Sequence, residues 1–144
     1  MVMREVRAEK YKPTLKQIQK SWPIYQNPGP KDFHLFVICL GDKTIGEIGY
    51  RYQGPGRHAV SLDIKIGQTS LWGQGLGTEA INLFDDYLFT KLKIQHIIAE
   101  PGDWNKRSIG LFKKCGFREI KREEVPPNDV FDGGIGVTMQ RDIE

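Results

Sequence analysis

The stretch LWGQGLGTEA, Leu71–Ala80, contains glycines at three alternate positions, Gly73, Gly75 and Gly77. The alternating apolar and polar residues of Ala59–Gly67 precede it and predict a strand, and the apolar spacing after it predicts a helix. Glycine N–H groups can approach a ligand closely, and the start of a helix adds unpaired N–H donors and partial positive charge. The stretch therefore predicts an anion site, with a phosphate as the favoured ligand.

The residues on either side predict the element order β-α-β-β-β-α-β-α-β-β. Expected strands are Val2–Ala8, Phe33–Leu40, Lys43–Gln53, Ala59–Gly67, Ile94–Glu100, Arg118–Glu124 and Ile135–Ile143, and expected helices cover 13–22, 78–92 and 105–117. The early strands form an antiparallel meander. Because crossover connections are right-handed, the two strands of the βαβ unit Ala59–Glu100 should be parallel. At 144 residues, the chain is expected to form one domain, residues 1–144, of the α/β class with a mixed sheet.

Three interpretations of the glycines compete. A dinucleotide fingerprint G-x-G-x-x-G fails from Gly73, since Thr78 holds the last position, although its looser form fits from Gly75 to Ala80 with Glu100 at a suitable distance. A Walker-type phosphate loop requires a Gly-Lys pair, and the sequence contains none. In the third interpretation the glycines bind nothing and only turn a tight corner.

A second segment, NKRSIGLFKKCGF at 105–117, shifts this balance. It resembles the second motif of the GNAT superfamily of N-acetyltransferases, and WGQGLGTEA at 72–80 resembles the acetyl-CoA loop of that family. The two motifs occur in the family's order, with a strand ending in AEP between them, whereas the dinucleotide interpretation explains only one of them. The resemblance covers Ala59–Phe117. Its motifs look most like those of the aminoglycoside 6′-N-acetyltransferases and the ribosomal-protein N-terminal acetyltransferases.

The resemblance implies a GNAT-like acyl-CoA N-acyltransferase fold, a mostly antiparallel sheet with one parallel pair of strands that splay apart. The pantetheine arm of acetyl-CoA would pair with strand backbone in the gap, and the diphosphate would bind N–H groups from Gln74 to Thr78. Acetyl-CoA is therefore the expected co-substrate, and no metal is expected because the histidines and cysteines lack ligand spacing. The implied cofactor contacts are Ile66, Trp72, Gly73, Gln74, Gly75, Leu76, Gly77, Thr78, Asn105, Lys106, Arg107, Ser108 and Phe112.

Two cations of the second motif give independent evidence for an anion. Lys106 and Arg107 fall in the first turn of the expected helix, where the helix dipole disfavours cations by ~0.3–1 kcal/mol. A CoA phosphate would offset that cost, while simple solvation of both side chains is the alternative. Asn105 also admits two roles, a cofactor contact and a helix N-cap. Ser108 is either close to the cofactor or an ordinary exposed serine.

The chemistry requires a neutral amine, and an alkylamine with a pKa of about 10.4 is mostly protonated at neutral pH. Glu100 is the candidate base because it ends the second parallel strand beside the expected gap. By resemblance, Glu100 matches one acidic position of the aminoglycoside-modifying branch and Asp63 matches a second. Two carboxylates in one cleft would attract a cationic amine. The alternative is that Asp63 has no role in binding and simply lies on the solvent-exposed face of its strand. By resemblance, a backbone N–H near Ile66 meets the developing oxyanion.

Two positions depart from the family pattern. Many relatives have a tyrosine general acid four residues before the Gly-Phe pair, and this chain has Phe112 there, which carries no proton to give. A thiol with a pKa of about 8.5 leaves tolerably well as thiolate, so an acid is not essential, and water or Tyr87 are other proton sources. Trp72 stands where the family often has Gln or Arg, which leaves phosphate contact more to the backbone.

The composition is ordinary for a globular protein, with 39% hydrophobic and 27% charged residues. A net charge of +3 is too small to predict nucleic-acid binding. No apolar run approaches the ~20 residues of a membrane span, and the first residues lack the apolar core of a signal peptide. With two cysteines, Cys39 and Cys115, and no export signal, we expect a cytoplasmic protein.

These observations predict an acetyl-CoA-dependent N-acetyltransferase. Direct attack in a ternary complex is expected because no Cys or Ser has a His placed to activate it. The acceptor is expected to be a primary amine, either on a small molecule such as an aminoglycoside, in which case the activity would confer antibiotic resistance, or on a protein N-terminus. No nucleic-acid or membrane partner is expected, and the sequence is compatible with a homodimer. The alternative is a non-catalytic acyl-CoA-binding regulatory or sensor module, and Phe112 is the feature that supports it.

Overall fold

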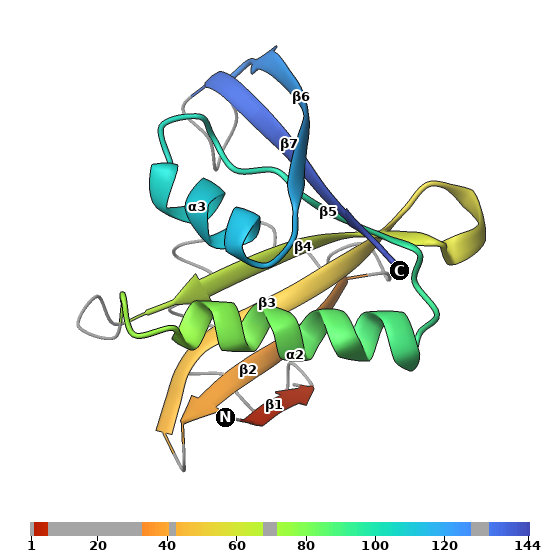
Figure 1. Cartoon of the computed structure of the whole chain (residues 1–144), viewed down its shortest axis with the longest axis vertical. Helices are drawn as coiled ribbons and strands as arrows, with labels where there is room; N and C mark the ends of the chain where they lie inside the picture. The colour runs from red at the N-terminus through yellow and green to blue at the C-terminus, as the bar shows by residue number, and fades with distance from the viewer. Residues whose placement is uncertain (1, 6–32, 41–42, 68–71, 128–132) are drawn as a thin grey trace.

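The computed structural model of the chain describes residues 2–5, 33–40, 43–67, 72–127 and 133–144. Within these residues, seven strands form one sheet in the order β1-β2-β3-β4-β5-β7-β6 (Figure 1). The β4–β5 pair is parallel and the other neighbouring pairs are antiparallel, which confirms the predicted mixed sheet. The strands are β1 (Val2–Glu5), β2 (Phe33–Leu40), β3 (Lys43–Gln53), β4 (Ala59–Ile66), β5 (His96–Ala99), β6 (Arg118–Val125) and β7 (Gly134–Asp142).

Among the fully described strands, the largest difference from the sequence prediction is at the start of β5. The strand begins at His96 rather than at Ile94, because the Ile94 N–H donates to the Leu88 carbonyl of the preceding helix, 3.0 Å away, and not to a neighbouring strand. The expected helix at 13–22, the end of the first expected strand and part of the last loop, 128–132, lie outside the described residues.

Helix α2 (Leu76–Thr90) covers one face of the sheet (Figure 1). Its buried stripe includes Ile81, Phe84 and Leu88, the helical spacing that the sequence predicts. The Phe84 ring meets Phe36 of β2 edge-to-face, with ring centroids 5.2 Å apart. Burial of each such side chain contributes roughly 1.5–3 kcal/mol to stability, and this packing fixes where α2 begins relative to the end of β4.

Helix α3 (Lys106–Lys114) begins directly after Asn105 and is shorter at its C-terminal end than the expected helix over 105–117. The Ser108 N–H donates to the Asn105 side-chain oxygen, 3.1 Å away, so Asn105 is the N-cap. Gly116 has a φ of 88°, the left-handed conformation that ends many helices, and the Phe117 N–H then bonds back to the Phe112 carbonyl. Ile109 and Phe112 anchor α3 in the core.

The parallel strands pair over a short length only. Ala59–Ser61 of β4 pairs with His96–Ile98 of β5, and beyond Ser61 the ladder between these strands ends. β4 continues along β3 as far as Ile66, while β5 continues along β7 to Ala99. The strands therefore diverge after Ser61, and the predicted splay is confirmed.

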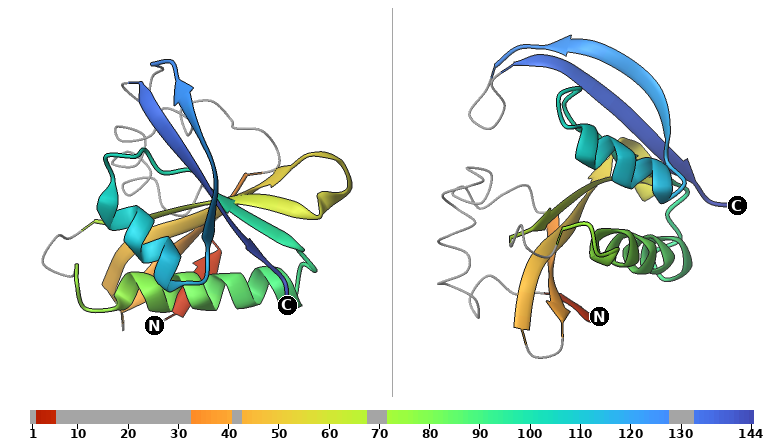
Figure 2. Two further views of the ribbon diagram at one scale, coloured as in Figure 1. Left: turned by 45° about the horizontal axis from the view of Figure 1, so that its top comes forward. Right: turned by 60° about the vertical axis from the view of Figure 1, so that its left-hand side comes forward.

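The β6–β7 hairpin extends away from the helix-covered part of the sheet and passes beside α3 (Figure 2). Arg141 of β7 ties this hairpin to α2, because its guanidinium donates to the carboxylate of Asp85 over 2.8 Å. Asp85 is only 1% exposed, so this ion pair belongs to the core. In the part of the chain that the structure describes, no helix is long and apolar enough to cross a membrane.

Candidate active site

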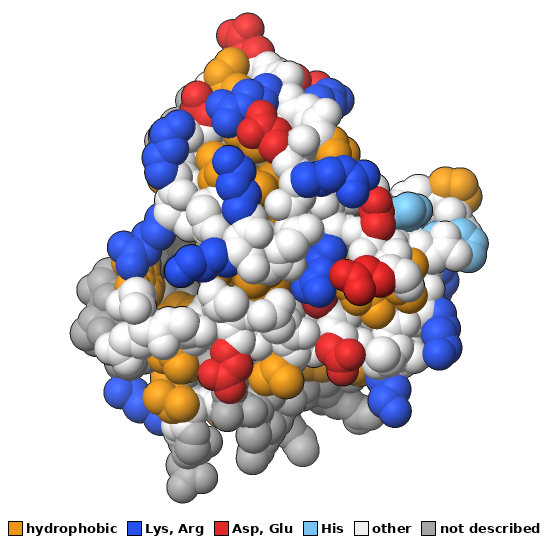
Figure 3. Space-filling view, viewed as in Figure 1, with side chains coloured by type: hydrophobic (Ala, Val, Ile, Leu, Met, Phe, Trp, Pro, Cys, Tyr) orange, Lys and Arg blue, Asp and Glu red, His pale blue; other side chains and the backbone are white. Residues whose placement is uncertain are grey.

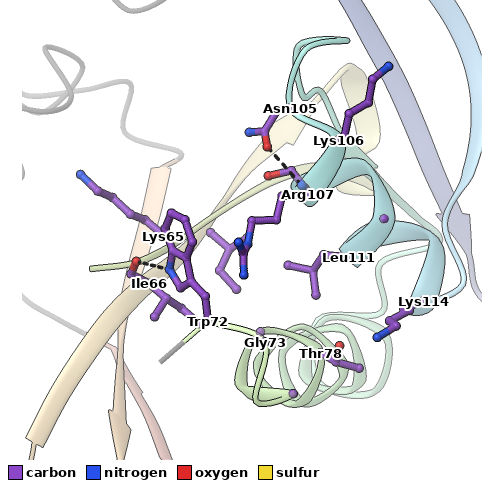
Figure 4. A pocket seen from close by; sticks show the side chains of 15 residues that line it. Lys65, Ile66, Trp72, Gly73, Thr78, Asn105, Lys106, Arg107, Leu111 and Lys114 are labelled. Carbon is purple, nitrogen blue, oxygen red and sulfur yellow. Dashed lines mark hydrogen bonds between the residues drawn. The ribbon is translucent and has the colours of Figure 1, made fainter. Parts of the chain in front are cut away.

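A pocket of about 530 Å³ lies where the end of β4, the start of α2 and one face of α3 converge (Figure 4). Basic side chains gather around this hollow on the molecular surface (Figure 3). Both sequence motifs that predicted a cofactor site contribute to its walls. The lining residues are Ile64, Lys65, Ile66, Trp72, Gly73, Gly75, Gly77, Thr78, Asn105, Lys106, Arg107, Ser108, Gly110, Leu111 and Lys114.

The first two glycines of the loop are required by backbone conformation. Gly73 and Gly75 have φ angles of 78° and 79°, in the left-handed region that most residues avoid, and a Cβ at either position would meet open space. Gly75 is the N-cap of α2, and no side chain caps the helix there. The first amides of α2 therefore receive no side-chain cap from the N-cap residue, and Gly77 and Thr78 lie at the pocket wall with the positive end of the helix dipole.

Glycine is required at position 77 for a different reason, the close packing of α3 against α2. A Cβ at this position would lie 3.1 Å from Cδ2 of Leu111, so its absence lets α3 approach α2 closely. Leu111 lines the pocket as well, and the contact between the two helices sets the width of this wall. The glycines thus shape a tight corner and also bring backbone to the pocket, so the corner-only interpretation accounts for part of the geometry.

The four basic residues at the pocket are not equivalent. The side chains of Arg107 and Lys114 are directed toward the cavity, whereas those of Lys65 and Lys106 extend away from it (Figure 4). The Arg107 guanidinium carbon lies 4.4 Å from the centre of the Trp72 ring. The Trp72 indole N–H donates to the Ile66 carbonyl over 3.2 Å, which joins the glycine loop to the end of β4.

The backbone of β4 presents polar groups to the diverging side of the strand. The Gly67 N–H donates to the Ile45 carbonyl of β3, 2.9 Å away, so alternate residues of β4 point their N–H and C=O groups toward β3. Ile64 and Ile66 belong to the opposite set, and their backbone groups face the side where β5 has departed. A ligand that extends along β4 at this place can pair with these groups as a strand would.

Three residues of the predicted cofactor set do not line the pocket. Gln74 is exposed on the loop, and Leu76 packs against the core. Phe112 is 5% exposed and packs on Phe117, with ring centroids 5.1 Å apart, so it is part of the core on the inner side of α3. Asn105 both lines the pocket and caps α3, and its two sequence interpretations are compatible.

The two predicted carboxylates flank the strand divergence. Asp63 and Glu100 each lie two residues beyond the last pair of the parallel ladder, Ser61 and Ile98, and they are close enough to interact electrostatically. Both are exposed, and Asp63 faces away from the α2 side because its neighbour Leu62 is in the core. Although the Asp63 side chain reaches solvent, partial desolvation by the surrounding protein raises its pKa above the usual range; the Arg51 guanidinium opposes this shift and the Glu100 carboxylate adds to it.

Sequence reasoning missed several residues of the site. Leu111 and Lys114 lie four and seven residues after Arg107, which is the helical spacing of a single face, and that spacing was available in the sequence. Glu47 of β3 had no such signal. It is 5% exposed, its Oε1 has no hydrogen-bond partner among the described residues, and burial raises its pKa to about 7 although Lys65 is nearby. Glu47 of β3 pairs with Lys65 of β4, which lies two residues after Asp63.

A family model described as an acetyltransferase (GNAT) domain matches residues 2–118. The chain belongs to the GNAT family of N-acetyltransferases. This match confirms the family that the two motifs indicate. The reaction of the family is acetyl transfer, in the acyltransferase class, and coenzyme A appears in solved structures of its members.

Curated GNAT relatives share part of their length with this chain. An N-acetyltransferase 9-like protein of Nematostella vectensis is 33% identical over 85 residues, which are 58% of this chain and 43% of the relative. The α/β-tubulin N-acetyltransferase 9 of Mus musculus is 34% identical over 94 residues, 65% of this chain and 33% of the relative. The chain therefore spans less than half the length of these relatives.

Solved structures with the same fold cover almost the whole chain. The aminoglycoside acetyltransferase AAC(6′)-Ib in complex with coenzyme A has a TM-score of 0.77 and 18% identity, over 98% of this chain and 94% of that one. A variant of the spermidine N-acetyltransferase SpeG from Vibrio cholerae has a TM-score of 0.76 and 17% identity, over 99% and 95%. At these identities the likeness shows the GNAT fold.

Proposed function

We propose that this protein is an acetyl-CoA-dependent N-acetyltransferase that transfers the acetyl group to a primary amine by direct attack in a ternary complex. One observation carries the proposal. A pocket built from both GNAT motifs and a pair of carboxylates, Asp63 and Glu100, flank the same divergence between β4 and β5. The divergence thus has an anion-binding end and a cation-attracting end, as a reaction between acetyl-CoA and an amine requires.

The residues of the pocket fit coenzyme A by chemistry and by placement. Amides at the start of α2, Gln74–Thr78, would hold the diphosphate, and the inward-facing Arg107 and Lys114 would supply positive charge. The pantetheine arm would pair with the outward backbone groups of Ile64, since the outward carbonyl of Ile66 already accepts from Trp72. That several neighbours with this fold were solved with coenzyme A supports the assignment.

The carboxylates would act on the acceptor. Glu100 takes a proton from the ammonium group, directly or through water, and Asp63 attracts and holds the cation beside it. The neutral nitrogen attacks the thioester carbonyl, the C–N bond forms, and the Ile66 N–H stabilises the oxyanion. Collapse of the adduct breaks the C–S bond and CoA leaves as thiolate. The acylated nitrogen releases its extra proton to water, and the thiolate takes up a proton from solvent, since Phe112 offers none. The products are the N-acetylated amine and CoA.

The acceptor we propose is a cationic primary amine. Two carboxylates at the divergence favour a cation, and relatives with this fold are described as acting on aminoglycosides and on spermidine, which supports a small polyamine-like acceptor. Relatives with higher sequence identity are described as α/β-tubulin N-acetyltransferases, which supports a protein N-terminus. Antibiotic modification is one form of the first case. We also propose that residues 1–144 form a single domain.

A specific observation supports a second candidate, a non-catalytic acyl-CoA-binding sensor. The position of the family's tyrosine is Phe112, and it is buried against Phe117 rather than placed at the pocket. A protein of this kind would bind acetyl-CoA through the same loop and would release no thiol above the uncatalysed rate.

Thiol release from acetyl-CoA separates the two candidates. The full chain is mixed with acetyl-CoA and a panel of aminoglycosides, polyamines and peptides with free N-termini, and free CoA is followed by its absorbance after reaction with a disulfide reagent. We expect release that saturates with at least one amine class. Binding of acetyl-CoA without amine-dependent release across the panel would contradict the enzyme and favour the sensor.

A further inference from the structure

Trp72 is anchored at the mouth of the pocket although it has no charge to offer a phosphate. Its indole N–H donates to the Ile66 carbonyl, 3.2 Å away, and this bond fixes the ring between the glycine loop and the end of β4. The ring is 43% exposed, so burial alone does not explain its position. One face of the indole is covered by the guanidinium of Arg107, 4.4 Å from the ring centre (Figure 4).

Arg107 comes from a different element. It is the second residue of α3, where the helix dipole opposes a positive charge. Among the described residues no carboxylate forms an ion pair with Arg107, and the first turn of α3 contains no acidic residue. Contact with the face of an indole is a favourable setting for a guanidinium, and it leaves the N–H donors at the edge of the group available.

The neighbouring cations lack this support. Lys106, in the same first turn, extends away from the cavity, and Lys65 does so from β4 (Figure 4). Lys114 is directed inward, but within the described part of the chain it makes no contact with the face of an aromatic ring. Arg107 is therefore the cation that packing holds in place at the pocket, and the packing partner is Trp72.

We propose that Trp72 is a positioning residue: it holds the Arg107 guanidinium at the pocket mouth, where Arg107 binds a phosphate group of CoA. This inference rests on the proposed binding of CoA in this pocket. The indole and the guanidinium act as one unit, in which α3 supplies the charge and the glycine loop supplies the platform. Without the platform, the guanidinium is free to leave the pocket for solvent.

A double-mutant cycle with a salt titration tests this unit. CoA binding to the full chain is measured by calorimetry for the wild type, Trp72→Ala, Arg107→Ala and the double variant, each at several salt concentrations. We expect about a tenfold loss of affinity for each single variant and no further loss for the double variant. Trp72→Ala should also reduce the salt dependence of binding as much as Arg107→Ala does, although it removes no charge.

Matched variants control for general effects. Trp104 is 68% exposed and lies outside the pocket lining, and Lys113 is an exposed cation of α3 that also lies outside it, so Trp104→Ala and Lys113→Ala should change affinity less than twofold. Trp72→Phe keeps an aromatic face but loses the N–H that anchors it to Ile66, so it should keep more affinity than Trp72→Ala and less than the wild type. In steady-state assays Trp72→Ala should raise KM for acetyl-CoA and leave kcat nearly unchanged. Repeating the titrations with dephospho-CoA shows which phosphate is bound. The affinity loss caused by Trp72→Ala and by Arg107→Ala disappears only if the 3′-phosphate is the partner of Arg107.

Three results would overturn the inference while the proposed function stands: additive losses in the cycle, an unchanged salt dependence in Trp72→Ala, or tighter binding by Trp72→Ala, which would make the ring an obstruction. A wild-type protein that binds no CoA would overturn the proposed function and this inference together.

Discussion

Leu111 of α3 occupies the space that a side chain at Gly77 of α2 would need, with its Cδ2 3.1 Å from the position of a Cβ there. Gly77→Ala improves helix propensity by about 1 kcal/mol but must displace Leu111 from the pocket wall. We therefore expect a folded protein with weaker CoA affinity, by roughly threefold to tenfold. Gly77→Ala combined with Leu111→Ala should regain part of that affinity, and calorimetric titration of the four proteins measures the cycle. An unchanged affinity in Gly77→Ala would show that this contact does not shape the site.

Glu100→Gln should lower the rate of acetyl transfer about a hundredfold at pH 7, because the amine then loses its proton acceptor. The loss should shrink as pH rises toward the pKa of the amine, since the neutral amine becomes abundant without help. Asp63→Asn should instead raise KM for a cationic acceptor and leave the shape of the pH profile unchanged. Thiol release measured between pH 6.5 and 10 checks both. Equal losses for Glu100→Gln at every pH would remove Glu100 from the role of base.

Glu47→Gln should stabilise the protein in alkaline solution. Burial raises the pKa of Glu47 to about 7 in the folded chain, so folding binds a proton at pH values between its unfolded and folded pKa. Stability is therefore lost as pH rises through this range, on the order of 2–3 kcal/mol by pH 8. Gln avoids that loss, and thermal melts should show a higher Tm for the variant at pH 8 and equal Tm values at pH 4. Glu124→Gln, at an exposed position on β6, serves as the control and should change neither melt.

Arg141→Gln should destabilise the fold by roughly 3–5 kcal/mol at pH 8, because Asp85 is left as a buried charge without its partner. Burial already raises the pKa of Asp85 to about 7 despite Arg141, so at pH 5 the carboxyl is protonated and the loss should be much smaller. Asp85→Asn together with Arg141→Gln should recover most of the stability at pH 8. Urea unfolding at the two pH values tests this, and a loss independent of pH would show that Arg141 acts through packing alone.

Local pattern predicted most of the fold because the pattern and the core agree. The alternation in Ala59–Gly67 and the helical stripe after Thr78 are the faces that the structure buries, and Asn105 and Gly116 mark the ends of α3 through their own backbone chemistry. The parallel arrangement of β4 and β5 followed from the handedness of crossover connections.

Contacts between distant segments were beyond that reasoning. Nothing near Trp72 in the sequence indicates that Arg107 stacks on it, and Asp85 appears as one more polar residue of α2 until the fold brings Arg141 to it. Glu47 lies in a strand of ordinary alternation, and its burial depends on the whole sheet. The sequence predicted the glycine loop and α3 as cofactor elements, but the direction of each cation depends on how the two helices pack.

Calorimetric titration of CoA into the full chain tests the central assignment most directly, with Gly75→Val and Gly75→Asn as a matched pair. Gly75 has a φ of 79°, which a β-branched residue resists and Asn tolerates. We expect saturable binding with one CoA per chain, abolished by Gly75→Val and retained by Gly75→Asn. A folded wild-type protein that takes up no CoA, or a Gly75→Val variant that binds as tightly as wild type, would contradict the account.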